Sequence, residues 1–171
     1  FAHERLDWWS GSSSASVIDE SLWHSLALAR ADVPTSGKKA FGVKFSPDGS
    51  QIALCACRLQ EDGSAYVEHI GQGTLADGLS WLTSFLCTEQ MADTTAAIAV
   101  DGRNGAAALI DRLRDYYPRQ ALYATSTANV VAATSMFSQA LIDKAVAHWD
   151  GGDDNAQAAL NASATEARKR L

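Results

Sequence analysis

The sequence predicts an α/β fold with a central mixed sheet of five strands and helices on both faces. In the stretch AFGVKFSPDGSQIALCACR (40–58), two runs rich in β-branched and aromatic residues flank Ser-Pro-Asp-Gly-Ser, which is the chemistry of a hairpin turn. A third strand, at 65–70, follows a second turn, so three antiparallel strands form a meander. After residue 71 the hydrophobic period changes, and helices alternate with short apolar strands. A meander that feeds such an alternation predicts a mixed sheet.

The second half of the chain supplies two of the five strands. The expected elements are a helix at 78–91, a strand at 94–100, a helix at 105–117, a strand at 120–126, a long helix at 129–149 and a last helix at 154–171. Right-handed crossovers place the fourth and fifth strands beside the first. Lys44, near the end of the first strand, and Asp101, directly after the fourth, should therefore be neighbours.

Length and composition favour one domain preceded by an arm. A chain of 171 residues with 47% hydrophobic positions can bury one sizeable core. Residues 1–36 are expected to form an N-terminal arm, in which Asp19 caps a short helix. The arm should pack Trp8, Trp9 and Trp23 against the outside of the core or against a preceding domain, because exposed tryptophans would leave large apolar patches.

Charge and cysteine content exclude several classes of protein. The net charge of −6 argues against a domain that grips nucleic acid by overall charge, so any DNA contact must be local. Neither a signal segment nor a run of 18 apolar residues is present, and the chain begins at Phe1, so it reads as a piece of a longer cytoplasmic protein. Cys55 and Cys57 share one face of a strand; they are interpreted as small buried hydrophobes rather than as metal ligands.

The candidate site lies at the carboxyl ends of the first and fourth strands, where α/β sheets collect ligands. Asp101 emerges there beside Gly102, and it is either a ligand-binding carboxylate or the cap of the next helix. Asp48, in the hairpin turn, is mainly a turn former. His148 is expected to pack in the interior. A small-molecule-binding α/β domain is disfavoured, because no glycine-rich phosphate loop follows the first strand.

Five motifs in order resemble the C-terminal nuclease domain of the large terminase subunit of tailed bacteriophages, particularly of actinobacterial phages and prophages. The motifs are FAHERLDWW, VIDESLWHSL, FGVKFSPDGSQIALCACR, AVDGRNGAAALIDRL and HWDGGDDNAQAALNASATEARKR. The resemblance spans nearly the whole chain. It implies a ribonuclease-H-like nuclease domain at 37–171. It also implies cutting of concatemeric viral DNA during genome packaging, in the cytoplasm of the bacterial host.

The resemblance further implies partners and a metal. Double-stranded DNA is the expected substrate, an ATPase motor domain would precede Phe1, and the small terminase subunit and the portal are expected partners. The family's chemistry uses carboxylates at the ends of the first and fourth strands and on a late helix to hold two Mg²⁺ or Mn²⁺ ions. Asp101 matches the fourth-strand carboxylate. The third carboxylate is expected shortly after Arg170, beyond Leu171 in a longer chain.

At the position where the family has its first-strand carboxylate, this sequence has Lys44. A cation thus stands in place of a metal ligand. Three interpretations remain open at the level of sequence. Asp48 or another carboxylate restores the metal site, so that Asp101, Asp48 and Lys44 form the catalytic group; or the domain binds metal poorly; or the longer protein supplies what is missing. The expected function is that of a metal-dependent endonuclease; the alternative is a catalytically weak or inactive module that positions DNA or docks on the motor.

Overall fold

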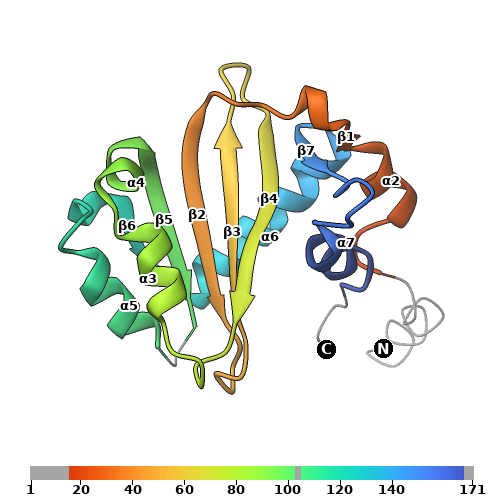
Figure 1. Ribbon diagram of the computed structural model, residues 1–171. Helices are drawn as coiled ribbons and strands as arrows, with labels where there is room; N and C mark the ends of the chain where they lie inside the picture. The colour runs from red at the N-terminus through yellow and green to blue at the C-terminus, as the bar shows by residue number, and fades with distance from the viewer. Residues whose placement is uncertain (1–15, 103–104, 168–171) are drawn as a thin grey trace.

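The computed structural model describes residues 16–102 and 105–167 and contains one mixed sheet with helices on both faces (Figure 1). The strands are β1 (Ala27–Leu28), β2 (Lys38–Phe45), β3 (Ile52–Leu59), β4 (Ala65–Gly73), β5 (Thr95–Asp101), β6 (Leu122–Ala124) and β7 (Val146–Trp149). The helices are α2 (Glu20–Ser25), α3 (Ser80–Leu86), α4 (Glu89–Thr94), α5 (Ala106–Leu113), α6 (Thr127–Ile142) and α7 (Ala158–Thr165), with 3₁₀ turns η1 (Arg30–Asp32) and η2 (Arg119–Ala121).

The strand order is β1-β7-β4-β3-β2-β5-β6. β2, β3 and β4 form the expected antiparallel meander, and β5 pairs in parallel with β2. The α/β class and the position of the fourth predicted strand beside the first are confirmed. The number of strands is corrected, because the described residues contain seven strands rather than five. The two additional strands, β1 and β7, are short and complete one edge of the sheet by pairing with each other and with β4.

The main core lies on one face of the sheet, beneath α3 and α5. Alternate residues of β2, namely Phe41, Val43 and Phe45, are buried there, as strand periodicity requires. Leu82 of α3 and Leu109 of α5 are fully buried against them. Lys44, one residue out of phase with this set, consequently projects from the opposite face.

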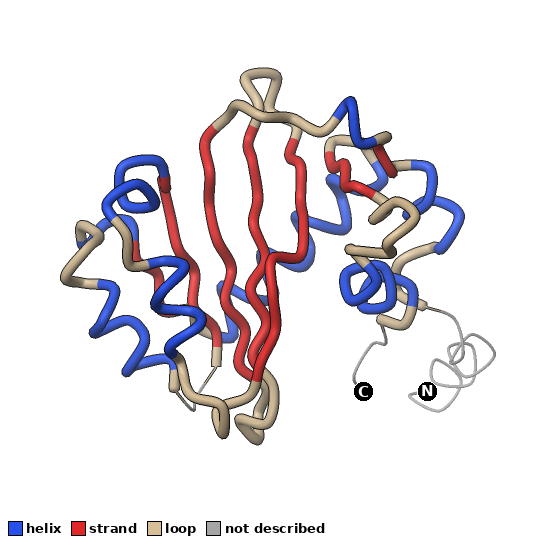
Figure 2. Tube along the Cα trace, viewed as in Figure 1, coloured by secondary structure: helices blue, strands red, loops and turns tan. Residues whose placement is uncertain are grey.

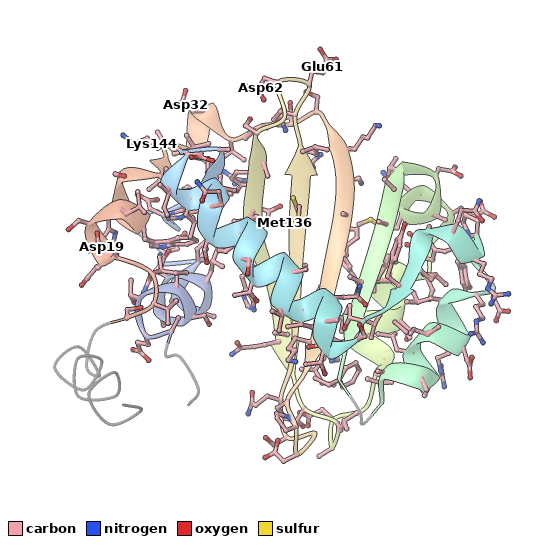
Figure 3. All side chains as sticks on the ribbon, turned by 180° about the vertical axis from the view of Figure 1, so that it is seen from behind. Asp19, Asp32, Glu61, Asp62, Met136 and Lys144 are labelled. Atoms are coloured by element: carbon pink, nitrogen blue, oxygen red, sulfur yellow. The ribbon has the colours of Figure 1, made fainter. Side chains whose placement is uncertain are left out.

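α6 crosses the opposite face of the sheet, as the view from behind shows (Figure 3). Its C-terminal end packs into a second core with α2, β7 and α7, which includes Trp23, Leu141 and Val146. Toward its middle the helix is open to solvent, and Met136 is 73% exposed. Trp8 and Trp9, for which the sequence predicted packing on the core, lie outside the described residues.

The predicted helix at 129–149 is wrong at its C-terminal end. α6 stops at Ile142, Lys144 takes a left-handed conformation with φ of 55°, and β7 follows. The amide of Ala145 donates to the carbonyl of Ala140, and the amide of Lys144 donates to that of Leu141, which is the hydrogen-bond pattern of a Schellman cap. This cap usually contains glycine, so a lysine in that position gave no sequence signal. α7 is likewise shorter than the predicted last helix.

Candidate functional site at the ends of β2 and β5

The site is built on two neighbouring parallel strands that end at the same edge of the sheet. Lys44 and Asp101 are Cα partners in the register of β2 and β5. Parallel partners project to the same face, so both side chains leave the sheet on the face opposite the main core. Loops gather at this edge, where β2, β4 and β5 end (Figure 2). The structure thus brings together two of the three residues that the sequence singled out.

The Lys44 ammonium donates a hydrogen bond to Oδ2 of Asp101 and forms an ion pair with it. The second carboxylate oxygen, Oδ1, accepts a hydrogen bond of 2.8 Å from the Thr125 hydroxyl. Both oxygens of Asp101 therefore have a protein partner. The Lys44 side chain is 59% exposed and that of Asp101 25% exposed, so the ammonium is the more accessible half of the pair.

Two opposing effects act on the pKa of Asp101. Burial raises it, but hydrogen bonds from Lys44 and Thr125, together with the positive charge of Lys44, outweigh burial and hold the pKa below its ordinary value. The carboxylate is therefore ionised at neutral pH. It does not cap α5, because the residue before that helix is Gly105, which has no side-chain cap.

The strand ends are held in place by close backbone packing. Gly102, directly after Asp101, has φ of +133°, a region that residues with a Cβ rarely adopt. A Cβ built there would lie 2.6 Å from Cβ of Phe45, the last residue of β2. Only glycine fits this approach, which fixes the end of β5 against the end of β2.

Asp48 is held inside its own turn. Its Oδ1 accepts hydrogen bonds from the Ser46 hydroxyl (2.6 Å), the Ser50 amide (3.0 Å) and the Ser50 hydroxyl (2.8 Å). The hydrogen bond from the Ser46 hydroxyl, followed by those from Ser50, lowers the pKa of Asp48 to about 2. Within the described part of the chain, no hydrogen bond or ion pair joins Asp48 to Asp101. Its role as a metal ligand stays a prediction.

Thr125 is the residue of the site that the sequence did not single out. It follows β6, which lies beside β5, and its amide donates to the Val100 carbonyl at 3.0 Å. This hydrogen bond holds Thr125 beside the end of β5, where its hydroxyl donates to the Asp101 carboxylate. The only available signal was a threonine near the end of the strand predicted at 120–126.

The donor set does not fit a two-ion centre. Across residues 16–102 and 105–167, no group of three or more His, Cys, Asp or Glu side chains could hold a metal ion. Among the described residues, the carboxylate at these two strand ends is that of Asp101, and its Oδ2 already accepts a hydrogen bond from the Lys44 ammonium. Two-ion chemistry needs several carboxylate oxygens around ions about 4 Å apart. The carboxylate that could take part in holding Mg²⁺ or Mn²⁺ is Asp101, after displacement of Lys44.

A surface pocket of about 410 Å³ lies away from this edge. It is lined by Thr83, Ser84, Cys87, Arg112, Asp115 and Tyr116, from α3, α5 and the residues after them. None of these residues belongs to the pair of strand ends.

Comparison with solved structures shows the fold. The crystal structure of the HK97 bacteriophage large terminase matches 88% of this chain with a TM-score of 0.62 and 14% sequence identity. This chain has a ribonuclease-H-like fold. It spans 36% of the length of that terminase chain. The yeast mitochondrial Holliday junction resolvase Ydc2 matches 86% of this chain at 15% identity, with a TM-score of 0.40. No protein-family model and no curated protein matches the sequence.

The described helices include none that is both long and apolar enough to cross a membrane. Among the described residues, Lys44 lies at the carboxyl ends of β2 and β5, the place where α/β sheets collect ligands.

Proposed function

We propose that this chain is the nuclease-fold domain of a phage terminase large subunit and that it engages double-stranded viral DNA during genome packaging. Its partners would be an ATPase motor in the same polypeptide, the small terminase subunit and the portal, in the cytoplasm of the bacterial host. The ordered motifs of the sequence and the structural likeness to the HK97 terminase support this proposal. The observation that carries it is the placement of Lys44 and Asp101 side by side at the ends of two parallel central strands.

Within that role, the geometry favours a module that binds and positions DNA without cutting it on its own. Lys44 stands where the family's first metal-binding carboxylate is expected. Its ammonium forms an ion pair with Asp101. A divalent ion would have to break this ion pair and would meet the positive charge of the displaced ammonium. Repulsion between the ammonium and a divalent ion therefore disfavours binding of the two ions on which this kind of hydrolysis depends.

A metal-dependent endonuclease is the second candidate, and the position of Asp101 favours it. The carboxylate is ionised, lies at a strand end and is held by Thr125 at 2.8 Å. Because Lys44 is 59% exposed, its side chain can turn into solvent and release one oxygen. Under this alternative, the chain is a phosphodiester hydrolase whose activity requires millimolar Mg²⁺ or Mn²⁺.

Incubation of the chain with supercoiled plasmid and Mn²⁺ separates the two candidates. The proposed module retards the plasmid in a gel and leaves it supercoiled. Nicking or linearisation that Asp101→Asn abolishes, while DNA binding persists, would establish the endonuclease instead. A chain that neither binds nor cuts DNA, with or without Mn²⁺, would overturn both candidates.

A further inference from the structure

The site has its own built-in cation. Lys44 is the Cα partner of Asp101, and its ammonium contacts Oδ2 of that carboxylate. Thr125 donates to Oδ1 at 2.8 Å, so the carboxylate is held from both sides.

The ammonium keeps donors free for a ligand. A lysine carries three N–H donors and no acceptor. One of them meets Asp101, and within the described residues no other acceptor is bonded to Lys44. The Lys44 side chain is 59% exposed and that of Asp101 25% exposed, so Lys44 is the more accessible of the two side chains.

The surroundings favour an anion over a second cation. α6, a helix of 16 residues, begins at Thr127, two residues after the threonine that bonds Asp101. Its N-terminal end brings the positive end of the helix dipole to the same sheet edge. The Lys44 ammonium and the positive end of this helix thus lie beside the Asp101 carboxylate.

We propose that Lys44, which stands where the resemblance places a metal-binding carboxylate, binds a backbone phosphate of double-stranded DNA directly. Asp101 and Thr125 are then positioning residues that aim the ammonium at the edge of the sheet. A single ammonium supplies one positive charge, which holds a phosphate but supplies no metal-bound water for hydrolysis. This inference rests on the proposed function, since it names how the nuclease-like fold contacts DNA.

The test measures binding of a short fluorescein-labelled DNA duplex in EDTA. Fluorescence anisotropy gives the Kd at several salt concentrations. Lys44→Met is expected to weaken binding about three- to tenfold and to reduce the slope of log Kd against log salt by about one. Lys44→Arg is expected to retain binding because it keeps the charge. Circular dichroism establishes that each variant is folded.

Lys38→Met is the matched control. Lys38 is an exposed lysine at the opposite end of β2, on the same face as Lys44, and about 20 Å from it along the strand. The control should leave both the affinity and the salt slope unchanged.

The remaining outcomes assign failure to one proposal or the other. Binding that requires Mn²⁺, or binding in EDTA that Lys44→Met and Lys38→Met weaken equally, overturns the phosphate contact at Lys44 and leaves the proposed function standing. Absence of duplex binding by the unmodified chain, both in EDTA and in Mn²⁺, overturns the proposed function and this inference with it.

Discussion

The indole of Trp23 stacks on the imidazole of His148, with ring centroids 3.9 Å apart and planes inclined by 8°. Both side chains are 1% exposed. His148 Nε2 lies 2.9 Å from the Trp23 carbonyl oxygen, and the Trp23 indole N–H donates to Oδ1 of Asn161 at 3.0 Å. One tryptophan in α2 thereby joins the segment at 16–36 to β7 and α7.

Trp23→Ala should lower the free energy of unfolding by about 3–5 kcal/mol, because it removes a fully buried aromatic side chain and leaves a cavity. Urea denaturation at neutral pH measures the change. Met136→Ala is the control: Met136 is 73% exposed, so its truncation should change stability by less than about 0.5 kcal/mol. A loss below about 1 kcal/mol for Trp23→Ala would show that α2 contributes little to the fold.

Gly102→Ala should destabilise the chain by about 1–3 kcal/mol, because the residue has φ of +133° and an added Cβ would meet Cβ of Phe45 at 2.6 Å. Gly42→Ala, in β2, is the control. Its Cβ would have nothing within 4 Å, and alanine is favoured over glycine within a strand. Thermal unfolding followed by circular dichroism should rank the two variants on opposite sides of the unmodified chain. Equal midpoints would contradict the close approach of the two strand ends.

Most of the fold could be predicted because short stretches of sequence specify most of its turns, strands and helices. The turn at 46–50 and the apolar run that ends at Asp101 each specify an element without help from the rest of the chain. β1 and β7 were missed for the opposite reason. β1 has two residues and β7 four, so neither shows an alternation, and both exist through pairing with partners distant in sequence.

The site was predictable in its strand-end residues and unpredictable in its contacts. Lys44 and Asp101 follow from strand ends and adjacency, which the topology rules supply. The bond from Thr125 depends on the register of β6 against β5, which no local pattern encodes. The hydrogen bonds of Asp48 to Ser46 and Ser50 are local, and the turn sequence was the signal for them.

Asp101→Asn should cost about 1 kcal/mol or less at pH 7, since Lys44 is 59% exposed and remains solvated without its partner. The pKa of Asp101 is held below its ordinary value of 3.8. A lowered pKa contributes stability that is present above the ordinary value and is lost as the pH falls through the lowered one. The difference between the variant and the unmodified chain should therefore shrink as the pH falls below 3.8 and disappear once the pH is below the lowered pKa.

Urea denaturation at pH 7 and at pH 2.5 measures this difference. Asp111→Asn is the control, because its ion pair with Arg114 joins two exposed side chains within α5 and the turn after it. Its effect should be smaller at both pH values. A loss of several kcal/mol for Asp101→Asn at pH 7 would mean that the Lys44 ammonium depends on the carboxylate far more than its exposure implies.

Lys44→Asp should create a divalent-cation site. Neighbouring strands lie about 4.8 Å apart, so two carboxylates at partner positions can share one ion, and oxygen ligands of this kind suit Mn²⁺ and Mg²⁺. Isothermal titration calorimetry with Mn²⁺ should show binding at least about tenfold tighter than that of the unmodified chain. The gain has two causes, since the substitution removes a competing ammonium and adds a ligand.

Lys44→Asn separates those causes, because it removes the ammonium without adding a negative charge. If the lost competition dominates, Lys44→Asn should reproduce most of the gain; if the new ligand dominates, the gain should be confined to Lys44→Asp. Adding Asp101→Asn to Lys44→Asp should abolish binding in either case. Equally tight Mn²⁺ binding by the unmodified chain and by Lys44→Asp would show that the ammonium does not keep metal from Asp101, and it would favour the metal-dependent endonuclease over the DNA-positioning module.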